Sequence, residues 1–110
     1  MGMWGIEPWD NDAAADLIGD LMDESSLRDI WAAKLAGAIE EDEPEEIRAC
    51  VWIFLQFGRT YVWPIDYIDE DLEVAITASE KLVNDPDLVD IEGMKEKLQG
   101  ELKTLIERRR

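Results

Sequence analysis

The feature that most constrains the fold is an apolar stretch at residues 49–57, in which Gln56 is the only polar residue. It is far too short to span a bilayer, which needs about 20 residues. Acidic residues and Pro44 precede it and Gly58 follows it, which are start and stop signals of a helix. A buried strand is the competing interpretation of so short a run. We expect a helix from about residue 44 to 57 that the other helices enclose on most sides.

Two helices are predicted before this stretch. Asp10, Asn11 and Asp12 are suitable caps for a helix over residues 12–23, whose apolar stripe is Ala14, Leu17, Ile18 and Leu21. Ser26 and Asp29 have the spacing of a capping box. A second helix follows them, with these residues facing inward: Leu27, Ile30, Trp31, Leu35, Ala38 and Ile39.

Two helices are also predicted after it. Asp69 is expected to cap a helix that ends at residues 84–87, with the inward stripe Leu72, Ala75, Ile76, Ser79, Leu82 and Val83. The last helix has the stripe Ile91, Met94, Leu98, Leu102, Leu105 and Ile106. The stretch between helices three and four, GRTYVWPIDY at 58–67, has no helical period and is expected to be an aromatic-rich loop.

The first eleven residues, rich in tryptophan and glycine, are expected to form an extended arm packed on the helices. Trp9 has the position of a hydrophobic staple on the first turn of helix one. The predicted fold class is therefore all-α. We expect residues 1–110 to form one compact domain, a bundle of about five helices with this arm and the aromatic-rich loop.

The charge of the chain restricts its partners. Asp and Glu number 27 against 11 Lys and Arg, which gives a net charge of −16. Such a field disfavours binding to nucleic acid or to an anionic membrane and favours a basic protein partner. The C-terminal Arg108, Arg109 and Arg110 are expected to complement the partial negative charge of a helix C-terminus.

The chain has few residues suited to catalysis or to binding transition metals. It contains no histidine, the commonest general base and transition-metal ligand, so no cofactor or metal is expected. A single cysteine, Cys50, excludes an internal disulfide, which favours the cytosol, and its apolar setting predicts a protonated core residue. The first residues lack the basic start and apolar run of a signal peptide, so a soluble cytoplasmic protein is expected.

Two sets of side chains are candidates for binding. Exposed acids before helices three and four form the first, as a surface for a basic partner: Glu40, Glu41, Asp42, Glu43, Asp66, Asp69, Glu70 and Asp71. The second is a small pocket in the loop, formed by Arg59, Tyr61, Trp63 and Tyr67. In the alternative, Tyr61 and Trp63 cover the core and Arg59 pairs with a nearby acid.

The opening MGMWGIEPWDNDAAAD resembles the start of small bacterial proteins grouped as domain of unknown function 4259. Trp9 stands where phenylalanine is expected, which keeps an aromatic residue there. The segments LAGAI and AITASEKLVNDPDL also resemble that family's helices in order. The resemblance implies a compact bacterial domain of mostly helical fold, and it implies no activity.

Three functions follow from these observations. The first is a non-catalytic binding module, of the kind that immunity proteins and antitoxins exemplify, which presents an acidic face to a basic partner. The second is a magnesium-dependent hydrolase similar to the all-α nucleotide pyrophosphatases, with Glu43, Glu46, Glu70 and Glu73 around one cavity. The third is a module that forms a homodimer through the apolar stripe of the last helix.

Overall fold

The structure is a computed structural model that describes residues 11–60 and 62–109, except the side chain of Ala15. Every regular element in this part of the chain is a helix. The all-α prediction is therefore confirmed. The helices are α1 (Asp12–Ser25), α2 (Leu27–Glu40), α3 (Pro44–Phe57), α4 (Ile68–Val83), α5 (Pro86–Val89) and α6 (Met94–Glu107). The four-residue α5 is additional to the five that the sequence predicts. The predicted arm, including the Trp9 staple, lies outside the described residues.

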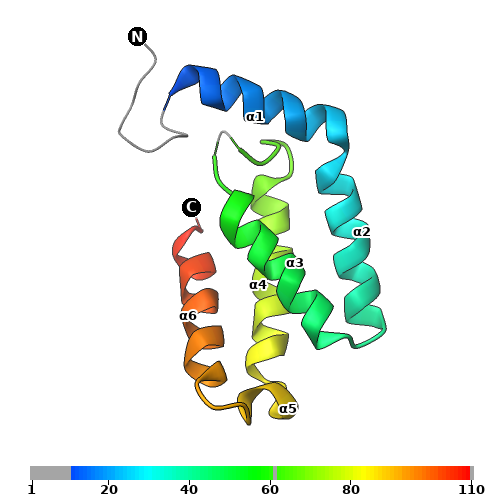
Figure 1. Cartoon of the computed structure of the whole chain (residues 1–110), viewed down its shortest axis with the longest axis vertical. Coiled ribbons are helices and arrows are strands. Elements are labelled where there is room, and N and C mark those ends of the chain that lie inside the picture. The colour runs from blue at the N-terminus through cyan, green and yellow to red at the C-terminus, as the bar shows by residue number, and fades with distance from the viewer. Residues whose placement is uncertain (1–10, 61, 110) are drawn as a thin grey trace.

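Helix α4 lies at the centre of the arrangement, with α3 and α6 beside it and α5 at its end (Figure 1). Eight of its side chains are buried, including Ile68, Leu72 and Leu82. The prediction that α3 is the enclosed helix is wrong. One side of α3 packs against α2, α4 and α6, while Trp52 on its other side is 57% exposed. The most apolar stretch of the sequence therefore keeps one face in solvent.

Helix α1 crosses one end of the molecule at a steep angle to α2 (Figure 1). The reversal of direction occurs at Ser26, whose φ of 55° is left-handed and whose side chain makes no capping bond. The predicted capping box of Ser26 and Asp29 is therefore wrong. The hydroxyl of Ser25 instead accepts a hydrogen bond from the amide of Leu27 at 3.3 Å. Helix α1 runs two residues beyond its predicted end because the turn takes a single residue.

The apolar stripes of α1 and α2 are only partly covered. Leu17, Leu21 and Ile30, all predicted to face inward, are exposed. The described contacts of α1 are mainly with α2, and its Met22 is buried and its Ile18 partly buried against the core, so the stripe is covered on one side only. In α2, Trp31, Leu35 and Ala38 are buried as predicted.

Apart from the start of α2, described above, the helix starts predicted from the sequence agree with the structure at α1 and α3 but not at α4. The side chain of Asn11 accepts a hydrogen bond from the amide of Ala14 at 2.8 Å, and Pro44 occupies the first turn of α3. Asp85 caps α5. The exception is α4, which begins at Ile68 with Tyr67 as its N-cap, so the prediction of Asp69 as the cap is wrong. The apolar Ile68 begins the helix because its side chain is buried in the core.

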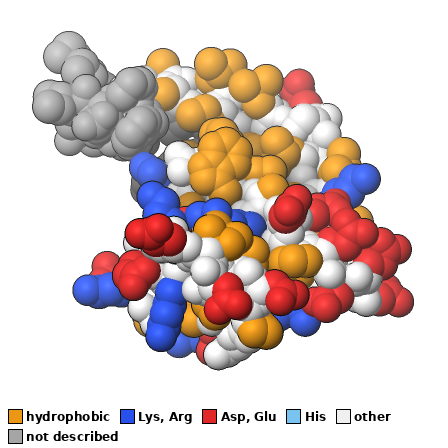
Figure 2. Space-filling view, turned by 60° about the horizontal axis from the view of Figure 1, so that its bottom comes forward, with side chains coloured by type: hydrophobic (Ala, Val, Ile, Leu, Met, Phe, Trp, Pro, Cys, Tyr) orange, Lys and Arg blue, Asp and Glu red, His pale blue; other side chains and the backbone are white. Residues whose placement is uncertain are grey.

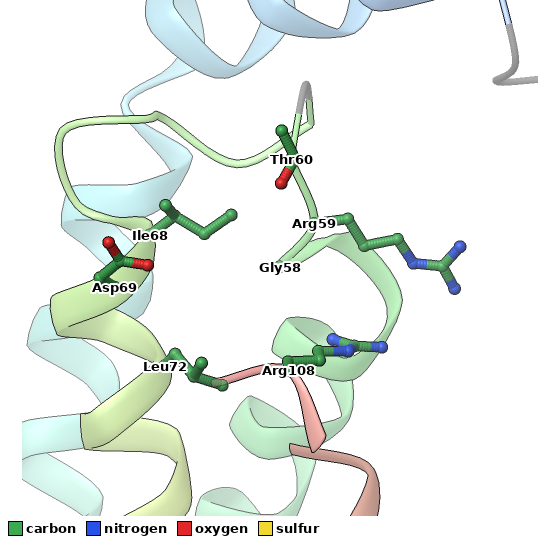
Figure 3. A pocket seen from close by; sticks show the side chains of 7 residues that line it. All are labelled: Gly58, Arg59, Thr60, Ile68, Asp69, Leu72 and Arg108. Carbon is green, nitrogen blue, oxygen red and sulfur yellow. The ribbon is translucent and has the colours of Figure 1, made fainter. Parts of the chain in front are cut away.

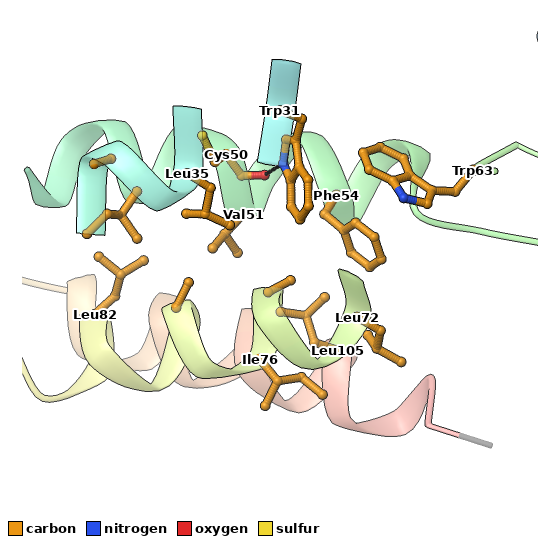
Figure 4. Packing of buried hydrophobic residues seen from close by; sticks show 14 of the residues in the cluster. Trp31, Leu35, Cys50, Val51, Phe54, Trp63, Leu72, Ile76, Leu82 and Leu105 are labelled. Carbon is orange, nitrogen blue, oxygen red and sulfur yellow. Dashed lines mark hydrogen bonds between the residues drawn. The ribbon is translucent and has the colours of Figure 1, made fainter. Parts of the chain in front are cut away.

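Three aromatic rings form one end of the core (Figure 4). Trp31, Phe54 and Trp63 come from α2, α3 and the loop, and their ring centroids are 5.0 to 5.5 Å apart. The indole nitrogen of Trp31 donates a hydrogen bond to the backbone carbonyl of Cys50 at 2.9 Å. Burial of the polar end of Trp31 therefore leaves no unsatisfied donor.

In the described part of the chain, no helix combines the length and the apolar character that crossing a membrane requires.

Candidate functional site

The loop between α3 and α4 covers the core instead of forming the predicted aromatic pocket. Trp63 is 2% exposed, and its ring meets those of Trp31 and Phe54 edge to face. This confirms the alternative interpretation of Trp63. Tyr61 lies outside the described residues.

Asp71 is a buried carboxylate, although the sequence analysis placed it among the exposed acids. It is 1% exposed and accepts two hydrogen bonds from the guanidinium of Arg28, each at 2.7 Å. The indole nitrogen of Trp63 donates a third at 2.8 Å. The hydrogen bonds to Asp71 raise the pKa of Arg28 above its ordinary value. The prediction for Asp71 is wrong because its carboxylate joins α2, the loop and α4 inside the molecule.

The spacing of Asp71 does contain a signal of burial. It lies three residues after Ile68 and four before Ala75, so it falls on the apolar stripe of α4. Arg28 was missed altogether, since its partner is 43 residues away and no local pattern indicates the pair.

Tyr67 and Arg59 lie in different environments. The guanidinium carbon of Arg28 is 3.8 Å from the centroid of the Tyr67 ring, which is a cation–π contact. Arg59 instead extends in the same direction as Arg108 (Figure 3). Both arginines line a cavity of about 240 Å³ with Gly58, Thr60, Ile68, Asp69 and Leu72. Of the predicted pocket, Trp63 therefore lies in the core, Tyr67 contacts Arg28, and Arg59 lines a separate cavity.

Arg108 binds the C-terminal end of another helix, α3. Its guanidinium donates to the backbone carbonyls of Phe54 at 3.2 Å and of Leu55 at 2.8 Å, in the last turn of α3. Burial, together with the charge of Arg59, lowers the pKa of Arg108. Arg108 therefore complements the C-terminus of α3 as the sequence predicts for a C-terminal arginine, whereas Arg109 pairs with Glu73 of α4 instead. Arg110 lies outside the described residues.

Six exposed carboxylates gather at the turn between α2 and α3. We name this surface the acidic corner, formed by Glu40, Glu41, Asp42, Glu43, Glu45 and Glu46. Lys81 forms an ion pair with Asp42 at 3.3 Å, and in the described part of the chain no other ion pair involves the corner. The corner is therefore a concentrated negative surface that faces solvent.

The second predicted acidic run lies at the opposite end of α4. Asp66, Asp69 and Glu70 are exposed near the start of α4, whereas Asp42 of the corner meets Lys81 in its last turn. The 16 residues of α4 separate these ends by about 24 Å. The two acidic runs are therefore separate surfaces, and the single acidic face expected from the sequence does not form.

The same separation applies to the glutamates of the hydrolase hypothesis. Glu43 and Glu46 lie at the corner, while Glu70 and Glu73 are in the first turns of α4. The carboxylate of Glu73 accepts two hydrogen bonds from Arg109, at 2.8 and 2.9 Å, which lower its pKa. The described residues contain no group of three or more potential ligands that could hold a metal ion. The shared cavity that this hypothesis requires is not formed by these four residues.

The stripe of the last helix faces the interior. Leu98 and Leu105 are fully buried, and Met94 and Leu102 are partly buried against the core. Helix α6 packs mainly on α4. Most of the apolar stripe that a homodimer was expected to use is therefore covered within one chain, whereas its members Ile91 and Ile106 are exposed.

An apolar concave surface lies between α2 and α3. This groove, which we name the α2–α3 groove, has a volume of about 380 Å³ and is lined by Ser25, Leu27, Ile30, Trp31, Lys34, Cys50, Ile53 and Phe57. Cys50 forms part of its floor, and burial followed by the charge of Glu46 raises the pKa of its thiol. The sequence analysis missed the groove because Ile30 was expected in the core.

These observations define a class: a small all-α protein whose exposed carboxylates gather at one interhelical turn beside an apolar groove. The family model of DUF4259, a domain of unknown function, matches residues 2–53 and confirms the resemblance carried by the opening residues. The matched range includes α1, α2 and the acidic corner and ends inside α3. No curated protein and no solved structure matches the chain.

Proposed function

We propose that the protein is a non-catalytic binding module whose acidic corner docks a basic partner protein. The acidic corner is the observation that supports this proposal, since six exposed carboxylates there face one lysine, Lys81. Opposite charge at such a surface accelerates encounter and discriminates among partners. Among binding modules we favour an immunity-protein or antitoxin-like role in a bacterial cytoplasm, because such proteins typically bind their toxins through complementary charge.

The net charge of the chain supports the same interpretation. With a net charge of −16 over 110 residues, the protein repels other anions. Its electrostatic field therefore attracts basic proteins among the macromolecules of a cell. Solubility alone also accounts for a high net charge, so the proposal rests on the local concentration at the corner.

The test is affinity capture from the native host at low salt with two charge-matched variants. The corner variant carries Glu40→Gln, Glu41→Gln, Asp42→Asn and Glu43→Gln. The control carries Asp16→Asn, Asp20→Asn, Asp66→Asn and Glu70→Gln, which are exposed and lie elsewhere. Both variants change the net charge by the same amount.

We expect the wild-type protein and the control to retain one basic protein that a salt wash releases, and the corner variant to lose it. Retention of no protein would contradict the proposal, as would equal retention by the corner variant. A toxin gene adjacent to the gene of this protein would support the antitoxin-like form.

A further inference from the structure

The α2–α3 groove is an apolar concavity on the surface of the described part of the chain. Its floor is made by the buried Trp31 and Cys50, and its rim by Ile30, which is 56% exposed, and Phe57, which is 45% exposed. Ser25 and Lys34 are the only polar residues among those that line it. Single exposed apolar residues are common, but two that border a concavity of about 380 Å³ are the usual sign of a binding surface.

Carboxylates border this apolar surface. Glu46 precedes Cys50 by one helical turn on α3 and belongs to the acidic corner, so the Cys50 end of the groove is the end nearest the corner. On α2 the same end is lined by Lys34, which precedes Glu40 by six residues, about 9 Å along the helix. Asp29 precedes Ile30 in α2, and its carboxylate, 71% exposed, pairs with Arg28 at 3.4 Å. Figure 2 shows the acidic side chains gathered at the right-hand edge, on the side of α2 and its turn to α3, with apolar side chains exposed nearby.

The charge of the chain decides among possible occupants. A second copy of this chain would bring its own net charge of −16 close to the acidic corner. The resulting repulsion opposes association of two copies through this face. A segment with apolar and basic side chains on adjoining faces satisfies both parts of the surface. Amphipathic helices bind grooves between helices in this way, with anchors at every third or fourth position.

We propose that the α2–α3 groove binds an amphipathic helix of the basic partner, with its apolar face in the groove and its Lys or Arg residues against the acidic corner. This inference rests on the proposed function and specifies the partner's binding segment. The apolar contact supplies most of the affinity, and the charges orient the helix.

The probes are three synthetic helical peptides of equal length, added to the full chain labelled with ¹⁵N. The first alternates Leu and Lys with helical period, the second replaces each Leu by Ser, and the third replaces each Lys by Glu. Amide chemical shifts locate each peptide on the surface, and titration gives its dissociation constant.

We expect the Leu/Lys peptide to shift amides of the groove, including Ile30, Ile53 and Phe57, as well as those of the corner. The Ser/Lys peptide should shift the corner alone and bind about tenfold or more weakly, because it lacks the apolar contact. The Leu/Glu peptide should not bind at low salt, because the corner repels it.

A matched pair of variants tests the groove directly. Ile30→Gln should weaken binding of the Leu/Lys peptide by about tenfold. Ile91→Gln should leave it unchanged, since Ile91 is similarly exposed and does not line the groove. Both side chains are half or more exposed, so neither change removes a buried core residue.

The outcomes separate the two proposals. Equal binding of the Leu/Lys and Ser/Lys peptides at the corner alone would overturn the groove proposal and leave the proposed function standing. Tight binding of the Leu/Glu peptide would contradict the proposal that the bound helix is basic. Failure of every peptide to bind at low salt would contradict both proposals.

Discussion

At the scale of single residues, Asp71 connects three parts of the chain that are distant in sequence. Its carboxylate accepts hydrogen bonds from Arg28 in α2 and from Trp63 in the loop, while Asp71 itself belongs to α4. Burial of a carboxylate is costly unless its charge and lone pairs are satisfied, and here the guanidinium and the indole satisfy them. The pair therefore fixes where the loop closes over the aromatic core.

Asp71→Asn should lower the free energy of unfolding by about 3 kcal/mol, because it removes the buried counter-charge of Arg28 and leaves only the exposed carboxylate of Asp29 as its ion-pair partner. Urea denaturation measures the change. Glu70→Gln, at the preceding exposed position, should cost about 0.5 kcal/mol through the lost helix N-terminal charge alone. Equal effects of the two substitutions would show that the buried pair contributes nothing specific.

Gly58 is required by a close approach and not by its backbone angles. A Cβ at this position would lie 2.5 Å from the carbonyl oxygen and from a ring carbon of Phe54. Gly58→Ala should therefore destabilise the protein by about 1–3 kcal/mol. Gly37→Ala, where a Cβ meets nothing within 4 Å, should stabilise it by about 0.5–1 kcal/mol. Thermal denaturation of both variants tests this, and a stabilising Gly58→Ala would contradict it.

The Cys50 thiol predicts a pH dependence with a definite sign. Burial raises the pKa of this thiol in the folded state above its value in the unfolded chain, so the unfolded chain ionises first as the pH rises. The associated stability is fully present well below the pKa of the unfolded thiol and is lost as the pH rises through the pKa of the folded one. Between about pH 8 and pH 10, the free energy of unfolding should therefore fall more for the wild-type protein than for Cys50→Ala. Parallel pH curves for the two proteins would refute the assignment.

At the scale of elements, the last helix contributes to the core instead of an interface. Leu98 and Leu105 are fully buried, and the neighbouring Ile106 is 42% exposed. The stripe in the sequence predicts an apolar face on this helix correctly, but its partner is α4.

Leu105→Ala should lower the free energy of unfolding by about 2–5 kcal/mol, because it leaves a cavity between α6 and α4. Ile106→Ala should have a much smaller effect, since this side chain is already partly in water. Chemical denaturation distinguishes the two. A larger effect of Ile106→Ala would mean that α6 is rotated from the orientation described.

The helix starts show which local signals are reliable. Asn11 and Pro44 act as the sequence predicts, because a cap side chain or a first-turn proline needs only its own helix. Ser26 fails as a side-chain cap because the α1–α2 connection takes a left-handed backbone there. Tyr67 replaces Asp69 as the N-cap of α4 because burial of Ile68 extends the helix backward.

At the scale of the whole molecule, the charge should oppose self-association. Leu98 and Leu105, the centre of the stripe expected to form a homodimer, are buried within one chain, and two chains that each carry a net charge of −16 repel each other. Light scattering should show a monomer at low salt across a concentration series. If association occurs, it should increase with salt, because screening weakens the repulsion. A dimer that is tighter at low salt would contradict this prediction.

The sequence by itself determined the helices, because helical periodicity and caps act within a few residues of the chain. It also determined the net charge and the internal position of Cys50. Only the tertiary structure decided which apolar faces were covered, since Ile30 and Leu105 both lie on regular apolar stripes yet one is exposed and the other buried. It also paired Arg28 with Asp71, separated the two acidic runs and opened the α2–α3 groove. Burial and ion pairing depend on how helices dock across long stretches of chain, and no local pattern in the sequence records that docking.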